Sequence, residues 1–174
     1  MPDTPAVPRP SQLWKQMSHE RRLQAADAFW RDENGFSEQG EVLAAIAQRI
    51  KFRVKSVVAL PIARKAQYLL ALPGVSELVA ARLLVAYHIQ HQRPMMGAFL
   101  DALGIAHDAG LIADESVTPP APATLREAVR AIAAAYPAED VALYLATLTW
   151  QDPDAWAALA EMPETRVETQ EQQS

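Results

Sequence analysis

The stretch LALPGVSELVAARLLVAYH, residues 70–88, decides the fold because it joins two apolar helical segments through a Pro-Gly pair. Proline cannot continue a helix and glycine readily ends one, so the pair marks the point where one helix stops and another starts. Between Leu78 and Tyr87, Arg82 is the only polar side chain before the tyrosine. A helix this apolar is predicted to be buried in a core.

Helical signals of the same kind run along most of the chain. We predict helices over residues 11–32, 37–59, 61–72, 75–92, 94–104, 124–136, 137–150 and 153–162. Ser37 and Asp152 are predicted N-caps, and Thr124 to Glu127 has capping-box spacing. The segment VALYLATLTW, residues 141–150, is apolar nearly all round, which is typical of a central helix. We expect an all-α fold, a compact bundle of about seven to nine helices with a docked C-terminal helical extension.

Proline-rich segments divide the chain into parts. Four of the thirteen prolines lie in residues 1–10 and three lie in TPPAP, residues 118–122. We predict an extended N-terminal arm over residues 1–10, a main helical body over 11–115, a Pro-rich linker over 116–123 and C-terminal helices over 124–162 that pack on the body. Residues 163–174 have almost no apolar content and are predicted to be a disordered tail.

Composition excludes several classes of site. The chain has no cysteine, so thiolate zinc sites, disulfide frameworks and thiol nucleophiles are absent. It has six glycines and no P-loop, dinucleotide or G-x-S-x-G motif, so we expect no cofactor. The His88 and His91 pair has no defined third ligand and no H-E-x-x-H pattern, so we also expect no metal. The start MPDTPAVPRP lacks a signal-peptide pattern, and no apolar run is long enough to span a bilayer. We therefore expect a soluble, cytoplasmic protein that does not bind a membrane.

Charge is distributed unevenly along the chain. The net charge is −5, but residues 1–48 carry −2, residues 49–93 carry +7 and residues 94–174 carry −10. A basic segment of this kind attracts an anionic partner unless the acidic C-terminal third covers it. The candidate binding residues are Arg49, Lys51, Arg53, Lys55, Arg64 and Lys65.

The most basic segment, RIKFRVK, residues 49–55, alternates charged and apolar side chains as an amphipathic strand does. A helix fits better, because the apolar side chains from Leu43 to Val57 fall within an arc of roughly 100° at helical periodicity. A lone strand would also lack a pairing partner. We predict a helix in which Val54 belongs to the buried stripe and Phe52 lies opposite it.

The stretch LPGVSELVAARLL, residues 72–84, resembles the helix-hairpin-helix family. The positions that match the family pattern are Leu72, Pro73, Gly74, Val75, Ala80, Arg82 and Leu83. In that family the backbone amides of the turn and nearby basic side chains grip a phosphate without reading sequence. The resemblance covers about a tenth of the chain and implies nucleic-acid backbone binding through Pro73, Gly74 and Ser76.

The sequence departs from that pattern where a phosphate would lie. Ser76 replaces the second glycine of the turn, Glu77 adds a negative charge, and Leu78 stands where a lysine is common. A simpler interpretation is that Pro73 and Gly74 end one helix while Ser76 caps the next, with Glu77 favourable in its first turn.

Histidines provide the only lead to enzyme chemistry. His88 and His91 are three residues apart, and His107 and Asp108 lie between Gly104 and Gly110. A metal could bridge the first pair, and the second could supply an acid and a base. Helix-end positions and a Gly104 C-cap explain the same residues without chemistry.

From these observations we predict a non-enzymatic helical binding protein that presents the basic face over residues 49–65 to an acidic or macromolecular partner, most simply a protein. One alternative is sequence-nonspecific nucleic-acid backbone binding through the basic region and the hairpin-like turn. A second alternative is a small metal-dependent or hydrolytic enzyme around His88, His91 and His107. No catalytic residue is assigned.

Overall fold

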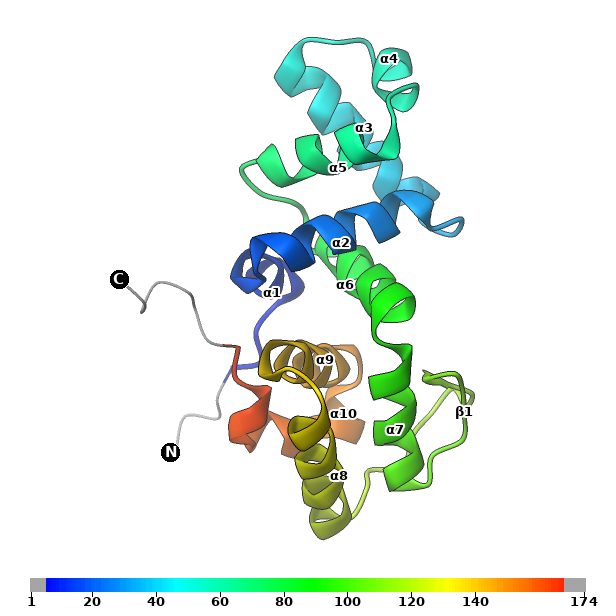
Figure 1. Cartoon of the computed structure of the whole chain (residues 1–174), viewed down its shortest axis with the longest axis vertical. Coiled ribbons are helices and arrows are strands. Elements are labelled where there is room, and N and C mark those ends of the chain that lie inside the picture. Colours follow the sequence, from blue (N-terminus) through cyan, green and yellow to red (C-terminus); the bar gives the residue numbers. More distant parts are fainter. Residues whose placement is uncertain (1–5, 168–174) are drawn as a thin grey trace, which may run out of the picture. The chain divides into compact units, whose positions relative to one another are not determined.

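The computed structural model of the chain describes residues 6–167 and confirms an all-α fold (Figure 1). Ten α-helices, two 3₁₀ segments and one short β-hairpin make up the described residues. Contacts divide the chain into two units, which we call the N-terminal unit (residues 10–90) and the C-terminal unit (residues 6–9 and 91–167).

The N-terminal unit is built from six helices: α1 (Pro10–Gln16), α2 (His19–Arg31), α3 (Phe36–Ile50), α4 (Val54–Val58), α5 (Ile62–Ala71) and α6 (Glu77–His91), the last residue of which belongs to the other unit. Helix α2 packs mainly on α5, and α3 packs on both α4 and α5. The buried side chains include Trp14, Phe29, Ile46, Leu69 and Leu83. These residues come from five helices, so the unit has a core of its own.

Both long helices predicted in this unit are interrupted. The expected helix over residues 11–32 breaks at Met17, and Ser18 starts α2 by accepting a hydrogen bond from the Arg21 amide. Met17 stays buried, which is why the apolar periodicity runs through the break unchanged. The expected helix over residues 37–59 ends at Ile50, and the predicted cap Ser37 lies inside α3, whose N-cap is Gly35.

The break after Ile50 corrects the prediction for RIKFRVK. Lys51 adopts a left-handed conformation with φ 57°, and the Phe52 amide bonds to the Ala47 carbonyl as in a Schellman-type helix end. Arg53 is extended, and α4 starts at Val54. The segment is therefore neither the predicted continuous helix nor a strand, and the helical phase does not carry Val54 into the core.

The C-terminal unit contains α7 (Arg93–Leu103), α8 (Pro122–Ala135), α9 (Ala138–Gln151), α10 (Pro153–Trp156), and the 3₁₀ segments η1 (Ala157–Glu161) and η2 (Pro163–Thr165). Helix α9 is buried from residue 140 to 149 and packs with α8, α10, η1 and η2, so its predicted central place is confirmed. Phe99 contacts the rings of Tyr144 and Trp156 in the same core.

A β-hairpin formed by β1 (His107–Asp108) and β2 (Leu111–Ile112) packs on α7. Its two-residue turn has positive φ at both positions, 46° at Ala109 and 90° at Gly110, as a type I′ turn requires. A Cβ at Gly110 would lie 2.7 Å from the Met96 Cβ, so the hairpin approaches α7 closely only because residue 110 is glycine.

Several predicted helix ends differ in the C-terminal unit. Helix α8 starts at Pro122 after Ala121, so Thr124 and Glu127 lie inside the helix and form no capping box. Asp152 is confirmed as a cap, because its carboxylate accepts a hydrogen bond from the Ala155 amide at 3.1 Å. Gly104 ends α7 in the left-handed conformation, also as predicted.

The predicted disordered tail begins with an ordered segment. Residues 163–165, expected to begin a disordered tail, form η2, in which the buried Thr165 hydroxyl donates to the Leu159 carbonyl. Residues 168–174 of that tail, and residues 1–5 of the N-terminal arm, lie outside the described residues. The expected docking of helices 124–162 on a body over 11–115 stays a prediction.

Candidate functional site

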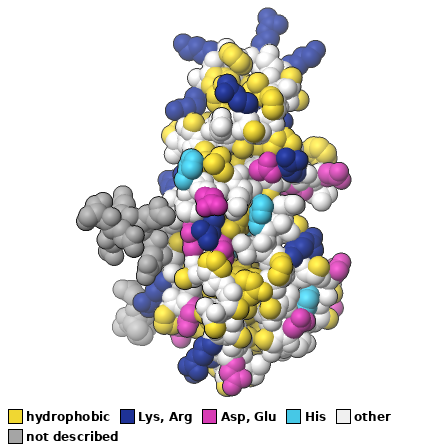
Figure 2. Space-filling model, in the orientation of Figure 1, with side chains coloured by type: hydrophobic (Ala, Val, Ile, Leu, Met, Phe, Trp, Pro, Cys, Tyr) yellow, Lys and Arg dark blue, Asp and Glu magenta, His cyan; other side chains and the backbone are white. Residues whose placement is uncertain are grey.

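The basic segment over residues 49–65 lies at the α3, α4 and α5 end of the N-terminal unit. All residues from Lys51 to Ser56 are exposed, and so is Arg49. On the face drawn in Figure 2, dark blue side chains spread from this end with yellow side chains between them and no magenta. We call residues 49–58 the basic tip.

The positive charges of the basic tip have no acidic residue near them in the sequence. No Asp or Glu occurs from residue 42 to 76, whereas six basic residues do. Within residues 6–167, the side chains of Arg49, Lys51, Arg53 and Lys55 form no ion pair and no hydrogen bond. Four uncompensated positive charges within seven residues give a local field that attracts anions.

The two α5 residues of the predicted set differ from the other four. Arg64 lies over the Tyr68 ring, 5.6 Å from its centroid, and its guanidinium donates to the Tyr68 hydroxyl at 3.5 Å. The Lys65 ammonium donates to the Val58 carbonyl at 3.5 Å and lies 5.0 Å from the centroid of the Trp30 ring. Lys65 therefore supports the end of α4, a positioning role that the sequence did not indicate.

Three apolar side chains are exposed among the charges. Phe52 is 53% exposed, Val54 47% and Val58 52%, whereas Val57 is fully buried. Val54 and Val58 are one helical turn apart on α4 and so share a face, while Val57 points into the unit. The exposure of Val54 and Val58 was not predicted from the sequence. The prediction assumed one continuous helix over residues 37–59, whereas the helix breaks at Lys51.

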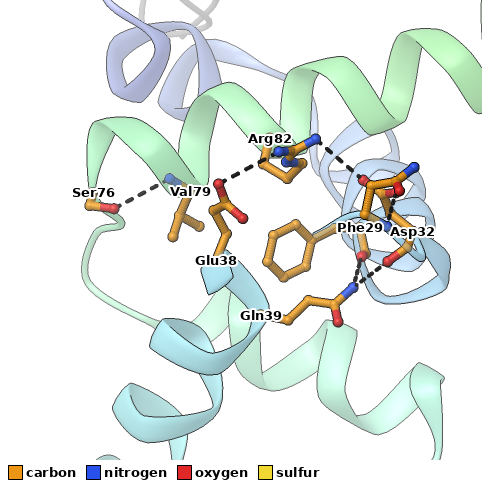
Figure 3. A network of polar contacts seen from close by, with 8 residues as sticks. Phe29, Asp32, Glu38, Gln39, Ser76, Val79 and Arg82 are labelled. Atoms are coloured by element: carbon orange, nitrogen blue, oxygen red, sulfur yellow. Dashed lines mark hydrogen bonds and ion pairs between the residues drawn. The ribbon is translucent and has the colours of Figure 1, made fainter. Parts of the chain in front are cut away.

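The hairpin-like turn of the helix-hairpin-helix resemblance is engaged in contacts within the chain (Figure 3). The Ser76 hydroxyl accepts a hydrogen bond from the Val79 amide at 3.3 Å and caps α6. The Arg82 guanidinium lies 3.8 Å from the Asp32 carboxylate and 3.7 Å from that of Glu38. Its charge is directed at two acids of the same unit, so the motif's basic residue is not presented to a phosphate.

Asp32 and Glu38 belong to a polar junction between α2 and α3 (Figure 3). The Gln39 side-chain amide donates to the carbonyls of Phe29 and Asp32, both at 2.8 Å, and so satisfies the end of α2. The Asp32 carboxylate also accepts from the Asn34 amide at 2.9 Å. Arg82 therefore links α6 to a junction whose role is structural.

Glu77 occupies the place where the resemblance would put a phosphate contact, and its carboxylate already has partners. It accepts hydrogen bonds from the Ser11 amide at 3.1 Å and from the Ser11 hydroxyl. Ser11 lies in the first turn of α1, where backbone amides lack helical acceptors. The Glu77 carboxylate thus accepts hydrogen bonds from the first turn of α1. The negative charge at the hairpin-like turn is therefore a side chain of the protein itself.

Replacing Glu77 with alanine is expected to lower the free energy of unfolding by about 1 kcal/mol, the typical effect of removing a helix cap. Urea unfolding followed by circular dichroism measures this change. Binding at the basic tip is expected to stay unchanged, because no tip residue contacts Glu77. An increase in stability would show that the Ser11 contact does not support α1.

Of the three histidines of the enzyme alternative, His91 is exposed at the end of α6, and His88 and His107 hold parts of the fold together. The buried His88 donates from Nδ1 to the Leu84 carbonyl at 2.8 Å. The Gly110 amide donates to Nδ1 of His107 at 3.0 Å, so the ring proton lies on Nε2 and is donated to the Asp101 carboxylate at 2.7 Å. Nδ1 of His107 thus closes the turn of the β-hairpin, and Nε2 joins the hairpin to Asp101 of α7.

Among the residues that the structure describes, no group of three or more His, Asp or Glu side chains is placed to hold a metal ion. No helix in residues 6–167 is long and apolar enough to cross a membrane.

Comparison with protein families, with curated proteins and with solved structures finds no match to this chain.

Proposed function

We propose that the chain is a cytoplasmic, non-enzymatic binding protein whose basic tip receives an anionic macromolecular partner. The observation that carries the proposal is the exposure of Arg49, Lys51, Arg53 and Lys55 without any internal counter-charge in the described residues. Arg82, by contrast, is paired with acids of its own unit.

The backbone of the basic tip supports the same interpretation. Lys51 occupies a left-handed helix end, where glycine is favoured and other residues pay roughly 1–2 kcal/mol. Strained residues persist where the surrounding structure fixes them, and they cluster at functional sites. A lysine here directs a charge outward at the bend between α3 and α4, next to Phe52 and Arg53.

The proposal is tested by the salt dependence of binding to a labelled polyglutamate peptide, measured by fluorescence anisotropy on the full chain. We expect binding at low salt that weakens steeply as salt rises, because exposed charges are screened beyond a Debye length of about 10 Å at 0.1 M. The variant Lys15→Glu, which changes an exposed charge on α1, serves as the control and is expected to bind as the parent does. Absence of binding at low salt would contradict the proposal.

Lys51→Gly separates the backbone strain at this position from the charge that its side chain presents. We expect the free energy of unfolding to rise by about 0.5–1 kcal/mol, because glycine adopts the left-handed conformation without strain. Affinity for polyglutamate is expected to fall about threefold, the effect of removing one exposed ion pair. Urea unfolding and anisotropy measure the two effects. A loss of stability, or an unchanged affinity, would contradict this account of Lys51.

A further inference from the structure

We infer that the partner of the basic tip is an acidic polypeptide segment that also carries apolar side chains, and not a nucleic acid. This inference rests on the proposed function, since it specifies what occupies the same surface. It comes from the exposed apolar side chains of the basic tip, whereas the proposed function rests on the exposed positive charges.

Exposed apolar side chains are grouped at the basic tip. Phe52, Val54 and Val58 are each about half exposed within seven residues of chain, and Phe52 lies between Lys51 and Arg53. Isolated exposed apolar residues need no explanation, but a group of three surrounded by cations resembles the apolar centre and polar rim of a protein interface. Aromatic residues and arginine are also enriched at such interfaces.

Nucleic acids and acidic polypeptides offer different groups to this surface. A nucleic acid offers phosphates to the cations and a base to stack on Phe52. Its aliphatic groups are limited to sugar carbons and single thymine methyl groups, so it has no apolar side chain to cover Val54 and Val58, which share one face of α4. A peptide that carries both carboxylates and apolar side chains can satisfy the cations and cover all three apolar residues.

The contacts of α4 determine how its exposed face is held. Helix α4 packs on α3 with Val57 buried, and Lys65 donates to the Val58 carbonyl, so Val54 and Val58 are presented on a supported surface. Lys55 lies next to this face in the helical rotation, about 100° from Val54. An apolar anchor of the partner that contacts Val54 and Val58 therefore places an adjacent carboxylate near Lys55.

The experiment compares three labelled probes of equal net charge on the full chain. One is a peptide of glutamate with interspersed leucine, the second has serine in place of leucine, and the third is a single-stranded oligonucleotide. We expect the leucine peptide to bind about tenfold more tightly than either of the others, the effect of a well-placed apolar anchor. Anisotropy gives the three affinities.

Variants locate the preference on the surface. Phe52→Ser and Val58→Ser are expected to remove the preference for leucine while keeping the binding of the serine peptide. The matched control is Phe36→Ser, since Phe36 is 75% exposed but lies at the start of α3 outside the basic tip. All three positions are exposed, and circular dichroism is the check that each variant folds.

The outcomes separate the inference from the proposed function. Equal binding of the three probes, with no effect of Phe52→Ser, would overturn the inference and leave the anionic partner in place. Tightest binding of the oligonucleotide would overturn it in favour of a nucleic acid. Self-association of the parent in sedimentation, abolished by Lys55→Glu, would overturn it in favour of a second copy of this chain. No binding of any probe at low salt would contradict the proposed function itself.

Discussion

Reversing three charges of the basic tip, Lys51→Glu, Arg53→Glu and Lys55→Glu together, is expected to weaken binding to polyglutamate by about 100-fold. Exposed ion pairs contribute about 0.5 kcal/mol each, and reversal replaces each attraction with a comparable repulsion. The total of about 3 kcal/mol corresponds to roughly a 100-fold change in the dissociation constant. Stability is expected to change little, since none of these side chains has an ion pair or hydrogen bond within the described residues.

The control for this variant carries the same total change of charge at other exposed positions. Lys15→Glu, Arg126→Glu and Arg130→Glu place three reversals on α1 and α8, away from the basic tip in sequence. We expect its affinity to remain within about threefold of the parent at moderate salt, because distant charges are screened. An equal loss in both variants would show that net charge alone governs binding.

Gly110→Ala is expected to lower the free energy of unfolding by about 3 kcal/mol, combining a strained positive φ with overpacking. Gly110 has φ 90°, and an added Cβ would lie 2.7 Å from the Met96 Cβ and 3.1 Å from the Arg93 carbonyl oxygen. Relief would require the β-hairpin to move away from α7. That movement would stretch the hydrogen bond from His107 of the hairpin to Asp101 of α7.

Two other glycines provide matched controls for Gly110→Ala. Neither Gly40 nor Gly74 has a heavy atom within 4 Å of a built Cβ, and neither has positive φ. Gly40 lies inside α3, so Gly40→Ala is expected to raise stability by about 0.5–1 kcal/mol, while Gly74→Ala changes it by less. Urea unfolding of the three variants gives the comparison. A Gly110→Ala variant as stable as the parent would contradict the tight packing described for the β-hairpin.

The sequence predicted those parts of the fold that depend on local patterns. Helical periodicity, the apolar segment of α9 and the polar cap at Asp152 each involve residues close in the chain, and each is confirmed. Ser76 also caps α6, as the simpler interpretation of the Pro-Gly turn predicted. The interruptions at Met17 and Lys51 were not predicted, because buried residues continue the same periodicity across the first and no glycine or proline marks the second.

The candidate surface was predictable in part. Arg49, Lys51, Arg53 and Lys55 could be found from charge alone, because no acidic residue lies near them in sequence. The exposure of Val54 and Val58 depends on a change of helical phase at the bend, which periodicity cannot show. The Arg82 and Glu77 contacts join residues far apart in the chain, so the engagement of the hairpin-like turn required the structure.

The most direct test of the binding surface is amide chemical-shift mapping of the full chain on addition of polyglutamate. We expect the perturbed amides to concentrate in residues 49–58, with smaller changes at Arg64 and Lys65. We expect no change around Pro73, Gly74 and Ser76, nor around His107 in the β-hairpin. Perturbations centred on the hairpin-like turn or on the C-terminal unit, with residues 49–58 unaffected, would contradict binding at the basic tip.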